Sequence, residues 1–158
     1  MNDVKRRITM SYDFVKEWKE RGDNAEHYVS KFFCYYIAFN WLYNTESDDS
    51  ETARIKQYIS KLISKESSYD PRPLLKSKEW SQEIRDGRSG RVNSYLQEPV
   101  DPRIHAFLQI YQVRCNLFHG SKSMKNPRNK ILVKEASDVL EDLLSVIIAN
   151  EDTGDDDV

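Results

Sequence analysis

The sequence AEHYVSKFFCYYIAFNWLY, at residues 25–43, is apolar on most sides of a helix drawn through it. A helix with that pattern is typically buried at the centre of a protein rather than laid on its surface. The preceding Gly22-Asp23-Asn24 favours the end of one helix and the start of the next. We therefore predict a central helix over about 25–43, against which the remaining elements pack.

The rest of the chain shows further helical spacing. Asp101 followed by Pro102 is typical of a helix start, and Gly120 is a natural stop for that helix. Gly87 and Gly90, which have arginines around them, are typical of a mobile loop. Amphipathic patterns predict helices over about 3–21, 51–65, 102–118 and 129–149, with a short helix over 74–85.

Length and composition indicate one helical domain. The chain has 158 residues, enough for a real core, and 32% of them are charged while only five are glycine. Because the sequence also has no convincing alternating strand pattern, we predict an all-α fold. This is an antiparallel helical bundle of four core helices with short extra helices. We expect it to cover residues 1–150, followed by a disordered acidic tail at 151–158.

Cysteine use and targeting signals indicate the cytoplasm. The N-terminus is charged and lacks the apolar core of a signal peptide, and no apolar run is long enough to span a membrane. Cys34 and Cys115 both fall in apolar helical stretches, which favours two buried free thiols over a disulfide. No Cys or His spacing suggests zinc, so we expect neither a metal nor a cofactor.

The net charge of −2 hides an uneven distribution. Five acidic residues lie in the tail, so the body carries a formal charge of +3. Residues 103–134 contain no Asp or Glu, and this segment either attracts a polyanion such as RNA or is a solvated surface. Its basic residues are Arg103, Arg114, Lys122, Lys125, Arg128, Lys130 and Lys134.

The segment RCNLFHG, at residues 114–120, closes the helix predicted over 102–118. Arginine binds phosphate and stays charged, while histidine moves protons near neutral pH. Arg114 and His119 therefore suit the cleavage of a phosphodiester without a metal. The alternatives are that His119 caps the C-terminus of its helix and that Arg114 pairs with an acidic residue of another helix.

Helix geometry decides how this pair could act. Positions five apart lie about 140° around an ideal helix. Arg114 and His119 reach one phosphate only if the helix loosens before Gly120 or if two chains cooperate. This geometry favours a homodimer.

Nearby residues are candidates for supporting roles, each with a plainer alternative. Asn116 either orients the pair or is an ordinary polar group of an interface. Tyr111 could stack a base, although core packing is the more ordinary role for it. Asn40, an amide on an apolar helix, indicates a buried hydrogen-bond network near the motif. The candidate contacts to RNA, which could also be solvated side chains, are Lys122, Lys125, Arg128 and Lys130.

These motifs resemble the HEPN superfamily, whose mark is an arginine, a spacer of about four to six residues and a histidine. The stretch YQVRCNLFHGSK, at residues 111–122, is similar to the R-N-N-L-F-H-G-x-K form of Apea-like members. The stretch YIAFNWLY, at residues 36–43, is similar to their W-I-A-F-N-x-L-Y helix. The resemblance covers roughly residues 25–150. One departure is Cys115, which stands where the family commonly has a polar residue.

The resemblance implies a bundle that dimerises through the motif-bearing helix and brings two Arg/His pairs into one cleft. Many such proteins are metal-independent RNases of toxin–antitoxin or anti-phage systems, and others have lost activity and bind partners. One expected function is thus a dimeric RNase with Arg114 and His119 as catalytic residues and an antitoxin or defence protein as partner. The other is a non-catalytic module that binds nucleic acid, a nucleotide or a protein. The intact pair favours the first function, and Cys115 favours the second.

Overall fold

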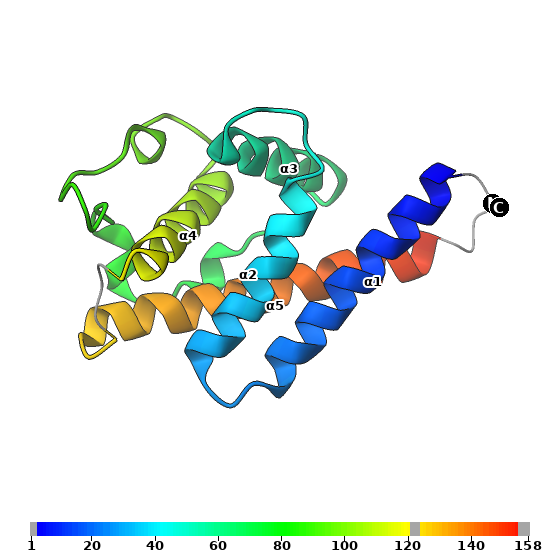
Figure 1. The fold of residues 1–158 in the computed structure, drawn as a ribbon. Helices are drawn as coiled ribbons and strands as arrows, with labels where there is room; N and C mark the ends of the chain where they lie inside the picture. The colour runs from blue at the N-terminus through cyan, green and yellow to red at the C-terminus, as the bar shows by residue number, and fades with distance from the viewer. Residues whose placement is uncertain (1–2, 121–123, 155–158) are drawn as a thin grey trace.

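The computed structural model describes residues 3–120 and 124–154, and within these ranges the chain forms α-helices and no strand (Figure 1). The prediction of an all-α helical bundle is confirmed. Three short 3-10 helices, η1 (Arg72–Leu74), η2 (Lys78–Ser81) and η3 (Ser94–Leu96), lie in the connection before α4. The α-helices are α1 (Asp3–Asn24), α2 (Tyr28–Tyr43), α3 (Glu51–Lys65), α4 (Pro102–Phe118) and α5 (Pro127–Gly154).

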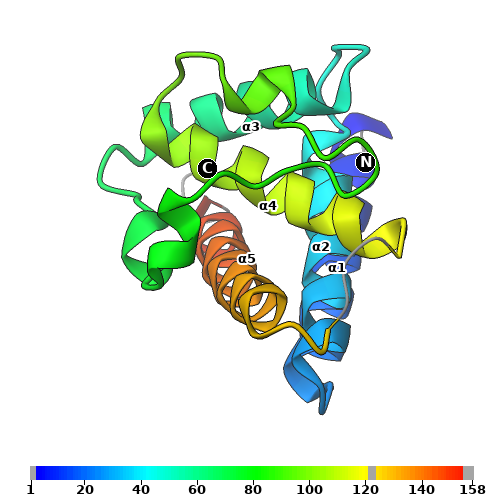
Figure 2. The same ribbon diagram turned by 90° about the vertical axis from the view of Figure 1, so that its left-hand side faces the viewer.

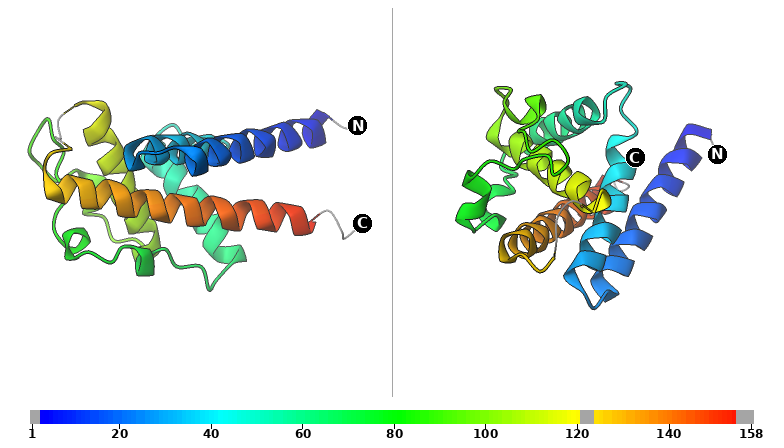
Figure 3. Two further views of the ribbon diagram at one scale, coloured as in Figure 1. Left: turned by 90° about the horizontal axis from the view of Figure 1, so that it is seen from below. Right: turned by 60° about the vertical axis from the view of Figure 1, so that its left-hand side comes forward.

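Helix α2 lies at the centre of the arrangement, as its apolar sequence predicted. It packs against α1, α3 and α5. Helices α1 and α5 contact each other and run in opposite directions, so the start of α1 lies on the same side of the molecule as the end of α5 (Figure 3). Helix α4 packs against α3 and α5, and its C-terminal end lies near the start of α5 (Figure 2).

The core is built around aromatic side chains of α2. Phe39 is fully buried, and its ring centroid lies 4.9 Å from that of Tyr43 and 5.5 Å from that of Phe107 in α4. Such tilted and edge-on contacts favour aromatic packing beyond the area that they bury. Val15 of α1, Ile55 of α3 and residues of α5 belong to the same cluster, so one hydrophobic core joins α1 to α5.

Helix α4 begins at Pro102 and ends at Phe118, which confirms the predicted bounds. The Asp101 side chain accepts a hydrogen bond from the backbone N–H of Arg103 at 2.8 Å, and Pro102 occupies the first turn. At the other end Gly120 has a φ of +61°, a conformation that glycine adopts without strain. Helix α4 is therefore regular up to the residue before His119, which is its C-cap.

Helix α1 ends at Asn24, three residues beyond the predicted end at Arg21. Gly22 does not break the helix. A Cβ atom at this position would lie 2.3 Å from Cε1 of Tyr35, so the missing side chain allows α1 and α2 to pack closely. The Tyr35 hydroxyl also donates a 2.7 Å hydrogen bond to Asp23, which joins the two helices.

The prediction of a short α-helix over 74–85 is wrong. Only the single turn η2 forms there, and Gln82 after it is extended. Tertiary partners take the polar groups of this segment, because Gln109 donates to the Trp80 carbonyl at 2.9 Å and Glu135 accepts from the Ser77 N–H at 2.8 Å. These contacts, with the burial of Trp80 and Ile84, override the local helical pattern.

A turn forms around Gly87 and Gly90, where the sequence predicts a mobile loop. The backbone N–H of Asp86 donates to the Arg91 carbonyl, and the Gly90 N–H donates to the Asp86 carbonyl, both at 2.8 Å. The Asp86 carboxylate accepts from the Arg88 N–H at 2.8 Å. The turn is thus closed by its own hydrogen bonds.

The last helix is longer than predicted. It continues through the first residues of the predicted tail to Gly154, and Asp152 forms a 3.1 Å ion pair with Lys16 of α1. Residues 155–158 lie outside the described ranges. None of the described helices combines the length and apolar character that crossing a membrane requires. Cys34 and Cys115 are free thiols, each half-buried.

Candidate active site

The C-terminal half of α4 carries the Arg/His motif. Arg114 lies one turn before the last residue of α4, Phe118, and His119 is the cap residue with φ −84° and ψ 2°. The helix does not unwind before this cap, since the His119 N–H still donates to the Cys115 carbonyl at 3.1 Å. The two side chains therefore leave α4 in different directions.

The Arg114 guanidinium packs against aromatic rings instead of carboxylates. Its Cζ lies 4.4 Å from the ring centroid of Phe118, one turn along α4, and 5.5 Å from that of Tyr36 in α2. Cations are attracted to ring faces at these distances. Phe33 continues the aromatic surface, with its ring centroid 5.1 Å from that of Phe118. The rings hold a permanent positive charge at one place on the surface.

Most of the hydrogen-bonding capacity of Arg114 is unused. Its Nε is buried and has no hydrogen-bond partner among the described residues, and its Nη1 makes only a 4.0 Å contact to Sγ of Cys115. Arg114 forms no ion pair with any residue that the structure describes, which argues against the simple ion-pair alternative. A guanidinium in this state can still bind an anion.

A small cavity of about 90 Å³ lies beside Arg114, between α2 and α4. Aromatic and aliphatic side chains form most of its wall, while Arg114 and Asn40 supply the polar groups. Asn40 is therefore brought to the same place as the motif arginine, as the sequence indicated. The lining residues are Phe33, Tyr36, Ile37, Asn40, Arg114 and Phe118.

Asn40 belongs to a hydrogen-bond network under this cavity. The Tyr43 hydroxyl donates to Glu51 at 2.7 Å and accepts from Nδ2 of Asn40 at 2.7 Å. Because the Tyr43 proton goes to Glu51, the Tyr36 hydroxyl donates to Tyr43, 3.1 Å away. Burial raises the pKa of both tyrosines, so they stay protonated. The network fixes the ring of Tyr36 beneath Arg114.

The exposed His119 ring turns back onto its own helix. Its Nδ1 lies 2.7 Å from the Cys115 carbonyl oxygen, which can only accept. Nδ1 therefore donates, and in the neutral ring the lone pair lies on Nε2. His119 thus does cap the helix, as one alternative proposed, and the cap orients a proton acceptor outward.

Arg114 and His119 border one accessible strip of α4. With about 100° between successive residues, the order around the helix is Arg114, Phe118, Cys115 and His119. Phe118 is 60% exposed, Cys115 is half-buried and His119 is exposed. We call these four residues the motif strip. Its width keeps the Arg114 guanidinium and the His119 ring of one chain apart. In a dimer, the Arg114 of one chain could face the His119 of the other.

Asn116 lies outside the motif strip. It is buried, its Nδ2 donates to the Arg85 carbonyl at 3.0 Å, and its Oδ1 accepts from the Gly87 N–H at 2.9 Å. Gln112, one turn earlier, donates to the same oxygen at 3.1 Å. Asn116 therefore holds the loop of residues 85–93 on α4.

Tyr111 is half-buried and lies one turn before Cys115, at the N-terminal end of the motif strip. Its ring packs edge-on against Tyr95, with 5.6 Å between the centroids. Burial raises its pKa, so the hydroxyl stays neutral. The packing against Tyr95 agrees with the more ordinary role that the sequence allowed.

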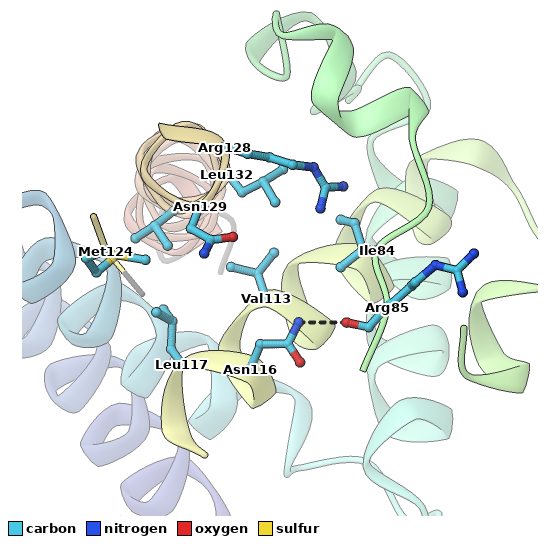
Figure 4. A pocket seen from close by; sticks show the side chains of 10 residues that line it. Ile84, Arg85, Val113, Asn116, Leu117, Met124, Arg128, Asn129 and Leu132 are labelled. Carbon is cyan, nitrogen blue, oxygen red and sulfur yellow. Dashed lines mark hydrogen bonds between the residues drawn. The ribbon is translucent and has the colours of Figure 1, made fainter. Parts of the chain in front are cut away.

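The candidate RNA contacts that the structure describes differ in whether their charges are paired within the fold. Lys122 lies outside the described residues, and Lys125 and Lys130 are exposed. Arg128 forms a 3.0 Å ion pair with Glu79 and donates to the Glu83 carbonyl at 3.1 Å. It lines a pocket of about 20 Å³ between α4 and α5, shown in Figure 4, so its charge is used within the fold.

The sequence interpretation missed the aromatic support of Arg114. The signal was present, because Arg114 and Phe118 are four apart on a helix and such positions are neighbours. Tyr36 is the first residue of the second motif and Phe33 lies three residues before it, and nothing in the local sequence places either of them against α4. Within the described ranges no group of three or more His, Cys, Asp or Glu side chains is arranged to hold a metal ion.

Comparisons with models of protein families, with curated proteins and with solved structures found no match. The geometry of the motif strip therefore carries the functional argument.

Proposed function

We propose that this protein is a metal-independent endoribonuclease whose site is completed by a second copy of the chain. One observation carries the proposal. The motif strip presents an arginine without an ion-pair partner among the described residues and a histidine whose cap hydrogen bond points Nε2 outward. Phosphate binding and proton transfer are the two tasks that RNA cleavage needs.

The chemistry follows from these groups. RNA carries its own nucleophile, the 2′-hydroxyl. His119 of one chain accepts the 2′-OH proton at Nε2 while the 2′-oxygen forms a bond to phosphorus. The bond from phosphorus to the 5′-oxygen breaks, and a protonated His119 of the second chain gives that oxygen a proton. Arg114 stabilises the charge that develops on the phosphoryl oxygens. The products are a 2′,3′-cyclic phosphate and a 5′-hydroxyl.

The exposed apolar side chains around the motif strip support a homodimer. Phe118 is 60% exposed, and Ile37 of α2, which lines the same cavity, is 36% exposed. Trp41, one turn further along α2, is 42% exposed and stacks on Phe14 of α1. Large apolar side chains that gather on one face are typical of interaction surfaces. The resemblance to HEPN proteins points to the same face, and it also motivates a toxin or defence role with an antitoxin or defence-system protein as partner.

A second candidate rests on Cys115. Its thiol contacts Arg114 and stands where HEPN proteins commonly have a polar residue. A protein of this kind could use the same surface to bind nucleic acid, a nucleotide or a partner protein without catalysis. RNA binding with no cleavage by the wild-type dimer would favour this second function.

The 2′-hydroxyl requirement gives a direct test. Purified wild-type protein is incubated with a mixed-sequence RNA and with the 2′-O-methylated copy of that RNA. We expect cleavage of the first, with 2′,3′-cyclic phosphate ends, and no cleavage of the second. Equal cleavage of both, or 3′-hydroxyl ends, would contradict the proposal because the 2′-oxygen would then not be the nucleophile.

A further inference from the structure

The loop that Asn116 holds on α4 contains three arginines. Residues 85–93 read RDGRSGRVN and carry three arginines and one aspartate, a formal charge of +2. We call this segment the arginine loop. Figures 1 and 2 show it between η2 and η3, and in Figure 2 it crosses the face of α4. It was not among the residues to which the sequence assigned RNA contacts.

The arginine loop has a defined shape. Asn116 binds both sides of its first turn, through the Arg85 carbonyl at 3.0 Å and the Gly87 N–H at 2.9 Å. Further along, Nδ2 of Asn93 donates to Oε1 of Gln112 at 2.6 Å. Two polar residues of α4 thus fix the two ends of the loop, and charges on it keep their positions relative to the helix.

The three arginines of the loop differ in the hydrogen bonds and ion pairs that their side chains form within the fold. Arg85 supports the loop itself, since it donates to the Gly90 carbonyl at 3.1 Å and pairs with Glu83 at 2.6 Å. The side chain of Arg88 is 63% exposed, and its only ion pair with a described residue is a 3.9 Å contact to Asp86. The exposed Arg91 guanidinium makes no hydrogen bond or ion pair within the described ranges.

Asn116 anchors the loop on the His119 side of the motif strip. Asn116 lies three residues before His119, which is about 4.5 Å along the axis and about 60° around it. Arg114 lies on the far side of the motif strip, about 140° from His119. A strand that crosses the motif strip therefore meets Arg114 at one edge and the arginine loop at the other.

We infer that Arg88 and Arg91 form an RNA-backbone binding site that holds the strand next to His119. The inference rests on the proposed function for its ligand, but not on catalysis. Arginines bind phosphate oxygens through paired N–H groups, and such contacts position a strand without reading its sequence. The sequence assigned an RNA contact to Arg128, but its guanidinium is paired with Glu79. Arg88 and Arg91 would bind the RNA backbone instead.

Binding of an uncleavable RNA tests the site. The probe is a short, fluorescently labelled, single-stranded 2′-O-methyl RNA of mixed sequence. The full-length wild type is compared with Arg88→Gln/Arg91→Gln by fluorescence anisotropy over a range of salt concentrations. We expect the double variant to bind roughly tenfold more weakly. Because each phosphate contact to a single strand contributes about 0.7 to the slope of log K against log salt, the slope should fall by about 1.4.

Two further double variants test whether the loss of affinity depends on the position of the removed charges. Lys61→Gln/Lys65→Gln removes the same net charge from a cleft near Asn150, at the far end of α5. Asn129, beside Asn116, lies roughly 30 Å along α5 from Asn150, so this control should bind like the wild type. Arg88→Lys/Arg91→Lys keeps both charges and should retain most of the affinity.

Three results would overturn the inference. These are wild-type affinity in the Arg88→Gln/Arg91→Gln variant, an equal loss in the Lys61→Gln/Lys65→Gln control, and no binding of RNA by the wild type. A failure of the nuclease proposal would look different. In that case RNA would remain intact, yet the arginine-loop variant would still lose affinity.

Discussion

Nδ1 of His119 lies 2.7 Å from the carbonyl oxygen of Cys115, four residues earlier in α4. The carbonyl can only accept, so this hydrogen bond selects the tautomer with a lone pair on Nε2. One contact therefore caps the helix and orients the group that would accept a proton from RNA.

Arg114→Lys should fail to replace arginine. The Arg114 Cζ lies 4.4 Å from the ring centroid of Phe118, and only a guanidinium can keep such a contact and still present paired N–H groups to a phosphate. We expect the rate of RNA cleavage to fall roughly 100-fold, with little change in thermal stability. Arg72→Lys, at an exposed arginine paired with Asp70, is the matched control and should cleave at the wild-type rate. Full activity of Arg114→Lys would show that charge alone is sufficient.

Heterodimers should report whether two copies share one site. Wild-type and His119→Ala chains are co-expressed with different tags, and the mixed dimer is purified through both. If one His119 is the base and the other is the acid, the mixed dimer loses one of them. Its rate should then fall below about one tenth of the wild-type rate, since general acid or base catalysis contributes 10²–10⁴-fold. A rate of one half would mean that each chain acts independently.

Gly22→Ala should destabilise the fold. The new Cβ would lie 2.3 Å from Cε1 of Tyr35, a fully packed ring whose hydroxyl is held by Asp23. Overpacking of this kind costs about 2 kcal/mol, which should lower Tm by roughly 4–8 °C in calorimetry. Tyr35→Leu removes the ring, so Gly22→Ala should cost much less in that background. An equal cost in both backgrounds would contradict the contact.

Asp101→Asn should make the free energy of unfolding depend less on pH below about pH 4. Hydrogen bonds from the Arg103 side chain and backbone lower the pKa of Asp101 to about 2, below the value of about 3.9 in an unfolded chain. This group therefore stabilises the fold above about pH 4, and the contribution is lost as the pH falls through 2.

Urea unfolding from pH 6 to pH 2 measures the effect. Asparagine can still cap α4 but carries no charge, so the free energies of unfolding of wild type and variant should converge toward pH 2. A constant difference across this range would show that the charge of Asp101 does not contribute.

Local signals in the sequence predicted the elements whose ends depend on local chemistry. Asp101 and Pro102 begin α4, and Glu51 follows the Ser50 cap of α3, so both helices have the predicted bounds. The segment 74–85 was predicted wrongly because its partners are distant in sequence. Gln109 binds the Trp80 carbonyl across 29 positions, and no local pattern contains that information.

The same limit applies to the candidate site. Arg114, His119 and Asn40 could be selected from their motifs, and the structure brings Arg114 and Asn40 to one cavity. Arg128 and its ion-pair partner Glu79 are 49 residues apart in the sequence. Asn116 and the Arg85 carbonyl to which it donates a hydrogen bond are 31 residues apart. Long-range pairing of this kind decides which charges remain available to a ligand, and it becomes visible only in the folded chain.

The most direct measurement is cleavage of RNA in EDTA by purified wild type, beside His119→Ala and Arg114→Ala. The proposed mechanism predicts that the wild type leaves 2′,3′-cyclic phosphate ends and that both substitutions abolish cleavage while the proteins stay folded. Intact RNA after incubation with a folded wild-type dimer, or equal cleavage by all three proteins, would contradict it.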